Sequence, residues 1–307
     1  MGKIAFVFAG QGAQYPGMGK ELYDTSPAAR KIMEEAERLR PGTMDQCFSG
    51  TAEELAITAN TQPCLFTVDL MCAAALLEKG QLPDLCAGFS LGEVAAASFM
   101  GVMDFETSFA FIQERARLMQ ACADAAPGFM AAVLRLSNDL VISLCEKFVN
   151  VYPVNFNAPG QVVVSGAVEQ KEAFLQAVSE QGGRAMPLKV SGAFHSPLMS
   201  SAAQALGNWL NNAATHLPSV PLYANRTAEP YGPDAPKLLS EQVDHPVLWE
   251  QTVRSMLDAG ADLFVELGPG TVLTGLIKKI IPDAAVCHVE NAASLAEAVT
   301  LLEGRKA

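Results

Sequence analysis

Apolar residues along this chain fall into two patterns. Short continuous runs predict buried strands, and longer segments with apolar residues at steps of three and four predict helices. Residues 4–8 form a run of the first kind. Residues 61–79 are apolar around most of a helical circumference, which predicts a buried helix with Thr61 as its N-cap and Pro63 in its first turn. Residues 105–121 have a single apolar face and predict an amphipathic helix.

The order of the predicted elements changes in the middle of the chain. The patterns there predict strands at 130–134, 151–156, 161–165 and 185–189, with helices at 138–148 and 168–181. This order, β-α-β-β-α-β, is that of a ferredoxin-like unit.

The flanking segments alternate helix with strand, which favours a parallel α/β sheet. Expected strands lie at 220–224, 262–267 and 285–289, and expected helices at 28–38, 51–57, 249–259, 270–279 and 294–302. We therefore predict a discontinuous large domain, residues 1–125 and 191–307, with a small domain inserted at 126–190. The cleft between two such domains is the first place to expect a site.

Composition narrows the class of protein. Half of the 307 residues are hydrophobic, enough for a sizeable core, and the net charge is -12 with no run of Lys or Arg, which argues against a nucleic-acid partner. Seven cysteines are scattered without a C-x-x-C pair, and the four histidines lack metal-ligand spacing. We expect reduced thiols in a cytoplasmic protein without a metal site. We expect neither a signal peptide nor a membrane span, because no apolar stretch approaches the ~20 residues that a span needs.

The clearest chemical motif is G-F-S-L-G-E at residues 88–93. An apolar run precedes it and helix-forming residues follow it, the context of a G-x-S-x-G nucleophile elbow. Gly88 and Gly92 leave room for the tight turn, so Ser90 would stand at a helix N-terminus, where the N–H of Leu91 can meet an oxyanion. A chance glycine-serine turn is the alternative.

Two further features allow more than one interpretation. The glycine-rich loop 9–19 after the first strand lacks the spacing of a nucleotide-binding motif, so we expect instead a loop whose backbone approaches a reaction centre. Arg115 borders the apolar face of the helix at 105–121 and needs an anionic partner. It serves either a structural ion pair or the binding of a substrate carboxylate.

A nucleophilic serine needs a base, and His195 is the best candidate. It lies where the chain leaves the predicted small domain, just before a helix start at Ser196-Pro197. No aspartate between Ser90 and His195 follows a convincing core strand, so another group must orient the imidazole.

Several motifs together resemble the malonyl-CoA:acyl-carrier-protein transacylases. They are G-Q-G-A-Q at 10–14, N-T-Q-P at 60–63, the elbow at 88–93, R-x-R-L-M at 115–119, P-V-N-F-N-A-P-G-Q-V-V at 153–163, A-F-H-S-P-L-M at 193–199, H-P-V-L-W at 245–249 and E-L-G-P-G at 266–270. The resemblance covers nearly the whole chain. It implies an α/β-hydrolase-like large domain with an inserted ferredoxin-like small domain.

The resemblance also implies the chemistry. A malonyl group would pass from malonyl-CoA to the pantetheine thiol of acyl carrier protein in fatty acid biosynthesis, with no cofactor. The roles it implies are nucleophile and base for Ser90 and His195, oxyanion-hole N–H groups for Gln11 and Leu91, substrate contacts for Arg115, Gln62, Asn155 and Phe194, and a histidine-orienting backbone carbonyl for Leu248.

One residue departs from the resemblance. The family usually has histidine before the nucleophile, where this chain has Phe89. We expect Phe89 to shape the pocket and leave the Ser90–His195 chemistry intact, and the alternative is that Phe89 only packs against the core. A serine esterase and a non-catalytic carrier-protein binding module are the alternatives of other classes.

Overall fold

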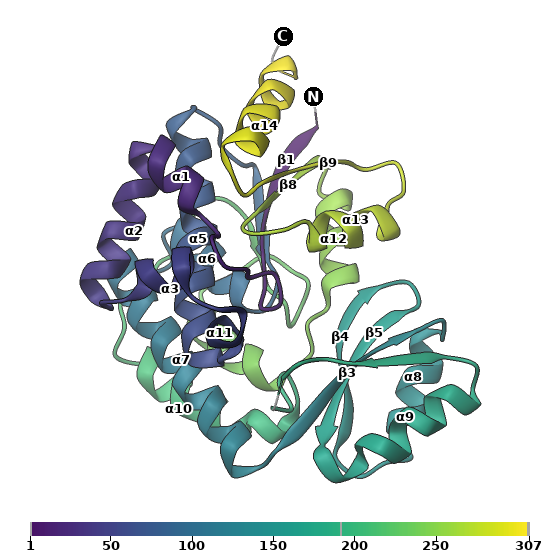
Figure 1. Ribbon diagram of the computed structural model, residues 1–307. Helices are drawn as coiled ribbons and strands as arrows, with labels where there is room; N and C mark the ends of the chain where they lie inside the picture. The colour runs from purple at the N-terminus through teal and green to yellow at the C-terminus, as the bar shows by residue number, and fades with distance from the viewer. Residues whose placement is uncertain (1, 191, 306–307) are drawn as a thin grey trace.

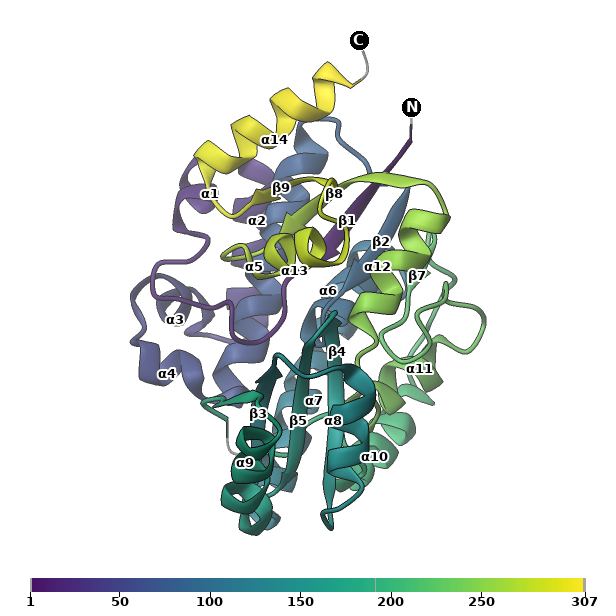
Figure 2. The same ribbon diagram turned by 90° about the vertical axis from the view of Figure 1, so that its right-hand side faces the viewer.

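Two β-sheets organise the protein, seen in a computed structural model that describes residues 2–190 and 192–305 (Figures 1 and 2). The first sheet is parallel, in the order β7-β2-β1-β8-β9: Leu222–Tyr223, Leu85–Gly88, Lys3–Phe8, Ala261–Leu267 and Ala285–Val289. The second is antiparallel, in the order β4-β5-β3-β6: Val151–Ala158, Gln161–Ala167, Gly128–Leu134 and Arg184–Pro187. Ser191, where the second part of the predicted large domain begins, lies outside the described residues.

Helices cover both faces of the parallel sheet. One face carries α1 to α7, α10, α11 and α14: Lys20–Thr25, Pro27–Leu39, Thr43–Ser49, Ala52–Ala56, Thr58–Glu78, Leu91–Phe99, Phe105–Ala125, Ser200–Leu210, Ala235–Glu241 and Ala292–Gly304. The opposite face carries α12 and α13, Trp249–Asp258 and Val272–Ile280. Helices α8 and α9, Asn138–Cys145 and Lys171–Glu180, pack on the antiparallel sheet. Short 3₁₀ turns η1 to η3 lie at Val168–Gln170, Pro197–Met199 and Gln242–Asp244.

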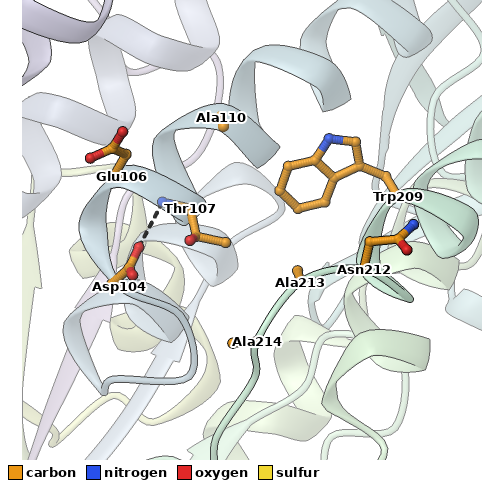
Figure 3. A pocket seen from close by; sticks show the side chains of 8 residues that line it. All are labelled: Asp104, Glu106, Thr107, Ala110, Trp209, Asn212, Ala213 and Ala214. Atoms are coloured by element: carbon orange, nitrogen blue, oxygen red, sulfur yellow. Dashed lines mark hydrogen bonds between the residues drawn. The ribbon is translucent and has the colours of Figure 1, made fainter.

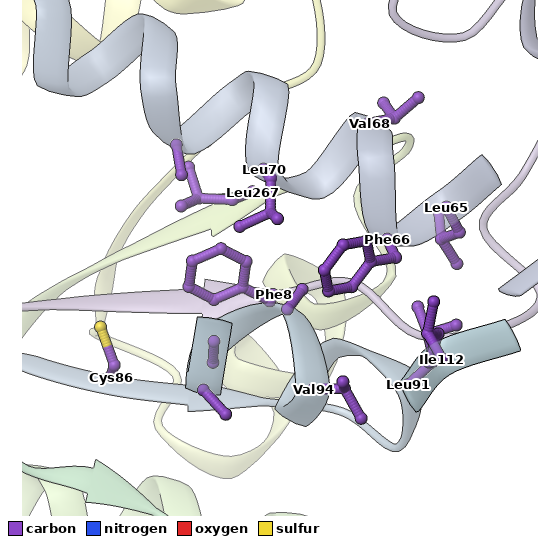
Figure 4. Close-up of a cluster of buried hydrophobic side chains, with 14 of the residues drawn as sticks. Phe8, Leu65, Phe66, Val68, Leu70, Cys86, Leu91, Val94, Ile112 and Leu267 are labelled. Atoms are coloured by element: carbon purple, nitrogen blue, oxygen red, sulfur yellow. The ribbon is translucent and has the colours of Figure 1, made fainter. Parts of the chain in front are cut away.

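Strand alternation divides the core between the two faces of the parallel sheet. Phe6 and Phe8 of β1 point to the helices of the first face, where Phe8 packs among side chains of α5, α6 and α7 (Figure 4). Ala5 and Val7 point to α12 and α13. Both faces of the sheet are therefore buried, as its nearly continuous apolar strands predict.

The predicted fold class is confirmed. The antiparallel sheet has the ferredoxin-like strand order, and it is joined to the rest of the molecule through β4, where Phe156 N–H donates to Val247 O (2.9 Å) and Val247 N–H donates to Val154 O (2.8 Å). Among the described residues no helix is both long and apolar enough to cross a membrane.

Some element boundaries differ from the prediction. Helix α5 begins at Thr58, one turn before the predicted N-cap. Thr61 does not cap it, because its hydroxyl donates back to the carbonyls of Leu55 and Ile57. Strand β7 has two residues, fewer than the five predicted. Helices α1, α3 and α11 lie in segments without a clear apolar period and were not predicted.

Asp69 is an unusual residue for the centre of this core. It lies on α5, fully buried, and neither carboxylate oxygen has a hydrogen-bond partner within the described part of the chain. Burial raises the pKa of Asp69 well above its ordinary value, and the negative charge of Glu266 raises it further. Asp69 therefore holds a proton more firmly in the folded protein than in the unfolded chain.

Replacing Asp69 with asparagine tests whether the folded protein holds a proton on this side chain. Above the ordinary pKa of aspartate, the folded wild type keeps a proton that the unfolded chain has lost, so its stability falls by up to about 1.4 kcal/mol for each unit of rising pH. Asp69→Asn has no such dependence. We expect the free energy of unfolding in urea to favour the variant more at about pH 8 than at about pH 5. The exposed Asp139→Asn is the matched control. An equal difference at both pH values would mean that Asp69 is ionised in the folded state.

Candidate active site

The turn between β2 and α6 holds Ser90 in a conformation that few residues adopt. Its φ is 53° and its ψ is -110°. A Cβ on Gly88 would lie 2.0 Å from the carbonyl of Gly92, and a Cβ on Gly92 would lie 2.2 Å from the carbonyl oxygen of Phe8. The turn thus fits between β1 and α6 only because both neighbouring positions are glycine. Ser90 stands at the end of β2, where the predicted elbow requires it, and only 9 % of the residue is exposed.

Asn225 holds this strained turn from the side. Its Oδ1 accepts from the N–H of Ser90 (2.7 Å), and its Nδ2 donates to the carbonyl of Gly88 (2.5 Å). Asn225 is fully buried just after β7, the strand beside β2. One amide therefore pairs with the backbone on both sides of Phe89 and fixes the elbow.

His195 meets Ser90 across the site. Its Nε2 lies 2.7 Å from Ser90 Oγ, and its Nδ1 lies 2.8 Å from the backbone carbonyl oxygen of Gln242. Since that carbonyl can only accept, Nδ1 carries the proton and Nε2 faces the serine hydroxyl as an acceptor. The geometry is that of a nucleophile with its general base.

The prediction that the Leu248 carbonyl orients His195 is wrong. That carbonyl accepts from the N–H (2.8 Å) and the hydroxyl (2.9 Å) of Thr252, inside the first turn of α12. Gln242, in the 3₁₀ turn before it, presents its own carbonyl to the imidazole. The 3₁₀ turn leaves that carbonyl free of a helical partner, whereas helix formation occupies the one on Leu248.

Burial keeps the imidazole neutral. It lowers the pKa of His195 to about 4, and the positive charge of Arg115 contributes in the same direction. The carbonyls of Gln242 and His245 oppose this shift only in part. At neutral pH His195 is therefore an unprotonated base, ready to accept the proton of Ser90.

Arg115 brings a positive charge to the same point from α7. Its side chain is 1 % exposed, and its two Nη atoms donate to the side-chain oxygens of Gln62 and Gln242 at 2.7 Å each. One Nη also lies 3.4 Å from Ser90 Oγ. Burial lowers the pKa of Arg115 to about 10, so it remains a cation. Both amide partners are neutral, so the guanidinium next to the nucleophile has no carboxylate bonded to it among the described residues.

The backbone beside Ser90 offers two N–H donors. Those of Gln11, in the glycine-rich loop after β1, and Leu91, at the start of α6, make no hydrogen bond within the described ranges. The loop approaches so closely that a Cβ on Gly10 would lie 2.5 Å from the carbonyl oxygen of Phe89. Phe89 packs edge-on against Trp249, on the α12 side of the sheet.

Asn155 and Phe194 make no hydrogen bond to this centre within the described part of the chain. Asn155 is on β4, where it pairs with Val163 and forms a bridge to Val247. Phe194 is 5 % exposed within the core of the first face. Of the residues predicted for the site, Ser90, His195, Arg115 and Gln62 are linked by hydrogen bonds, directly or through one another.

Two hollows border the site, each lined by one of its predicted residues, His195 or Gln11. One, of about 380 Å³, has His195 in its wall between β4 and residues 244–246. The other, of about 120 Å³, is lined by the glycine-rich loop, Phe89 and Val272. A wider hollow of about 520 Å³ lies elsewhere, between Asp104 at the start of α7 and Trp209 of α10 (Figure 3), and contains none of the predicted site residues. Among the described residues no three His, Cys, Asp or Glu side chains group as metal ligands.

Three residues of this site, Gln242, Asn225 and Glu93, are not among those predicted from the sequence. Glu93 had a usable signal, since it is a single carboxylate in an apolar helix one turn after the nucleophile. Gln242 and Asn225 lie in short irregular segments, and no pattern in the sequence connects them to Ser90.

Comparison with known proteins agrees with this geometry. Residues 5–302 match the family model described as "Acyl transferase domain". The chain is 38 % identical to a malonyl CoA-acyl carrier protein transacylase of Bacillus subtilis, covering 91 % of each protein.

Solved structures give the same result. A malonyl CoA-acyl carrier protein transacylase from Clostridium perfringens superposes with a TM-score of 0.95 at 34 % identity, covering 99 % of this chain and 98 % of that one. A malonyl-transacylase in complex with its type II PKS acyl-carrier protein gives a TM-score of 0.94 at 34 % identity, covering 97 % and 99 %. The chain therefore belongs to the acyl transferase domain family, among the malonyl CoA-acyl carrier protein transacylases.

Proposed function

We propose that this protein transfers a malonyl group from malonyl-CoA to the pantetheine thiol of acyl carrier protein, through a malonyl ester on Ser90. The observation that carries the proposal is the buried guanidinium of Arg115, whose bonded partners are all neutral: the amides of Gln62 and Gln242 and, at 3.4 Å, the Ser90 hydroxyl that His195 activates. A carboxylate is the natural bidentate partner of such a cation. Malonyl-CoA carries one at the end of its acyl group.

The first half-reaction acylates the enzyme. Ser90 Oγ attacks the thioester carbonyl while its proton passes to His195 Nε2. The N–H groups of Gln11 and Leu91 donate to the resulting oxyanion. When the tetrahedral intermediate collapses, the carbon–sulfur bond breaks and the imidazolium returns the proton to the sulfur of coenzyme A, leaving malonyl-Ser90 and a neutral histidine.

The second half-reaction reverses these roles. The pantetheine thiol of the carrier protein gives its proton to His195 and attacks the ester carbonyl. Ser90 then leaves and recovers the proton, so the chain ends as it began. Every proton transfer and charge stabilisation in this cycle uses side chains or backbone of this chain, so we assign no metal or organic cofactor to it.

Substrate contacts extend the same proposal. Arg115 binds the malonyl carboxylate, with Gln62 holding one side of the guanidinium. We assign Asn155 and Phe194 to the walls of the acyl pocket, on the strength of their resemblance to the family motifs and their positions on β4 and next to His195. The PKS carrier of the solved complex belongs to that protein, and for this chain we propose the carrier of fatty acid biosynthesis.

Two broader assignments complete the proposal. We divide the chain into a large domain at 1–125 and 191–307 and a small domain at 126–190, because the four described strands of the antiparallel sheet all lie within 128–187. We place the protein in the cytoplasm, since all seven cysteines are free thiols, as a reducing compartment keeps them.

Intact mass after mixing with malonyl-CoA tests the nucleophile. The wild type should gain one malonyl group, and Ser90→Ala should gain none. His195→Ala should acylate ~10²–10⁴-fold more slowly, the usual contribution of a positioned general base. The alternatives give other outcomes: an esterase would release malonate quickly without carrier protein, and a binding module would show no added mass. A stable malonyl adduct on Ser90→Ala would contradict the proposal.

Arg115→Ala tests the carboxylate contact. Removing one member of a buried charge pair costs ~3–5 kcal/mol, so malonyl loading should fall by more than a hundredfold while loading from acetyl-CoA changes little. The measurement is the rate of acyl-enzyme formation from each thioester. Arg117→Ala, on the exposed side of the same helix, is the matched control. Equal losses for both acyl groups would make Arg115 a structural residue.

The rate at which Ser90 reacts with a fluorophosphonate, measured as the pH is lowered, tests whether His195 is neutral. The reagent is uncharged, so its reaction with Ser90 does not require Arg115. With the pKa of His195 at about 4, the base stays unprotonated above that pH, so the reaction rate should change less than twofold between about pH 7.5 and about pH 5.5. An ordinary histidine would lose about tenfold over the same range. Circular dichroism at each pH checks the fold, and a tenfold loss would contradict the assignment.

A further inference from the structure

Glu93 is a buried carboxylate beside the site that the mechanism above does not use. It lies in the first turn of α6 and is 1 % exposed. Burial raises the pKa of Glu93 to about 7, against the opposing effects of its hydrogen bonds and of Arg115. An acid this close to a nucleophile is either a structural cap for α6 or a part of the site.

Three donors converge on the two oxygens of Glu93. Oε1 accepts from the hydroxyl of Tyr231 (2.5 Å) and from the N–H of Asn225 (3.2 Å). Oε2 accepts from Nε2 of Gln242 (2.6 Å). Only an ionised carboxylate accepts from all three without a competing proton of its own.

The hydrogen bond between Glu93 and Gln242 determines which way the side-chain amide of Gln242 points. Nε2 of Gln242 faces two acceptors, Oε2 of Glu93 and the backbone carbonyl of Ser90 (2.7 Å). Oε1 consequently faces Arg115 and accepts from its guanidinium (2.7 Å). A reversed amide would direct its NH₂ group at the cation and leave two acceptors without a donor.

We propose, on the basis of the function proposed above, that Glu93 is a positioning residue for malonyl recognition, which orients the Gln242 amide and through it the guanidinium of Arg115. Glu93 does not touch the substrate. It makes Gln242 present an acceptor to one side of the guanidinium, while Gln62 presents another at 2.7 Å. Held between these two amides, the cation is fixed beside Ser90 before the carboxylate arrives.

Glu93→Gln is the decisive variant. The new amide has a single accepting oxygen, which can keep the hydrogen bonds from Tyr231 and Asn225. Its NH₂ group then points toward Nε2 of Gln242. Two donors then face each other, so the Gln242 amide rotates and Arg115 loses an acceptor. We expect malonyl loading (kcat/KM) to fall by about tenfold or more through a higher KM, with acetyl loading within about threefold of wild type.

The matched control is Tyr231→Phe. It removes a donor from the same buried carboxylate and leaves the bond to Gln242 in place. Its ratio of malonyl to acetyl loading should stay within about twofold of wild type. In an Arg115→Ala background, Glu93→Gln should lower malonyl loading by less than about twofold, because the two residues act through one contact.

The outcomes separate this inference from the proposed function. Malonyl-Ser90 in the wild type tests the function by itself. If the wild type loads malonate but Glu93→Gln keeps the wild-type ratio, or loses malonyl and acetyl loading equally, the positioning role is wrong. If Glu93→Gln does not fold, Gln242→Leu is the second variant. It removes the amide that links Glu93 to Arg115 and keeps the backbone carbonyl that orients His195. An unchanged ratio in that variant would overturn the inference as well.

Discussion

The close crossing of β1, β2 and α6 at the Ser90 turn is the constraint on which the site depends. Gly88 and Gly92 permit α6 to approach the end of β1 within distances that no Cβ tolerates. The left-handed conformation of Ser90 is costly by itself, since a strained residue of this kind costs about 1–3 kcal/mol. The amide of Asn225 holds it from the end of the neighbouring strand, so the Ser90 hydroxyl rests on a rigid support.

Burial and neighbouring charges set the charge states of the two titratable side chains beside this turn, His195 and Arg115. His195 is neutral because burial and the nearby Arg115 both oppose its protonation. Arg115 remains charged, and the negative charge that acts on it is that of Glu93, on the far side of the Gln242 amide. Because Glu93 is separated from it by this amide, the guanidinium has no bonded anion among the described residues. Its side toward Ser90 lies close to the Ser90 hydroxyl. In the proposed function, a substrate carboxylate completes the charge pair.

Gln242 connects the two parts of this arrangement. Its backbone carbonyl orients the imidazole, and its side chain contacts Arg115, Glu93 and the carbonyl of Ser90. The base and the cation are thereby fixed relative to each other by one residue in a 3₁₀ turn. The antiparallel sheet borders the same region, because β4 joins the segment at Val247 that follows this turn.

The sequence by itself determined the parts that rest on local patterns. The apolar runs predicted the strands of both sheets, the glycine spacing predicted the Ser90 elbow, and the period of α7 placed Arg115 at the border of the core. Tertiary structure decided what local pattern cannot encode. Which carbonyl meets His195 depends on whether a peptide lies in a helix or in the turn before it, so Gln242 has this role and Leu248 does not. Asn225 and Gln242 stand 135 and 152 residues from Ser90, and only the folding of β7 beside β2 and of η3 beside α6 brings their amides to it.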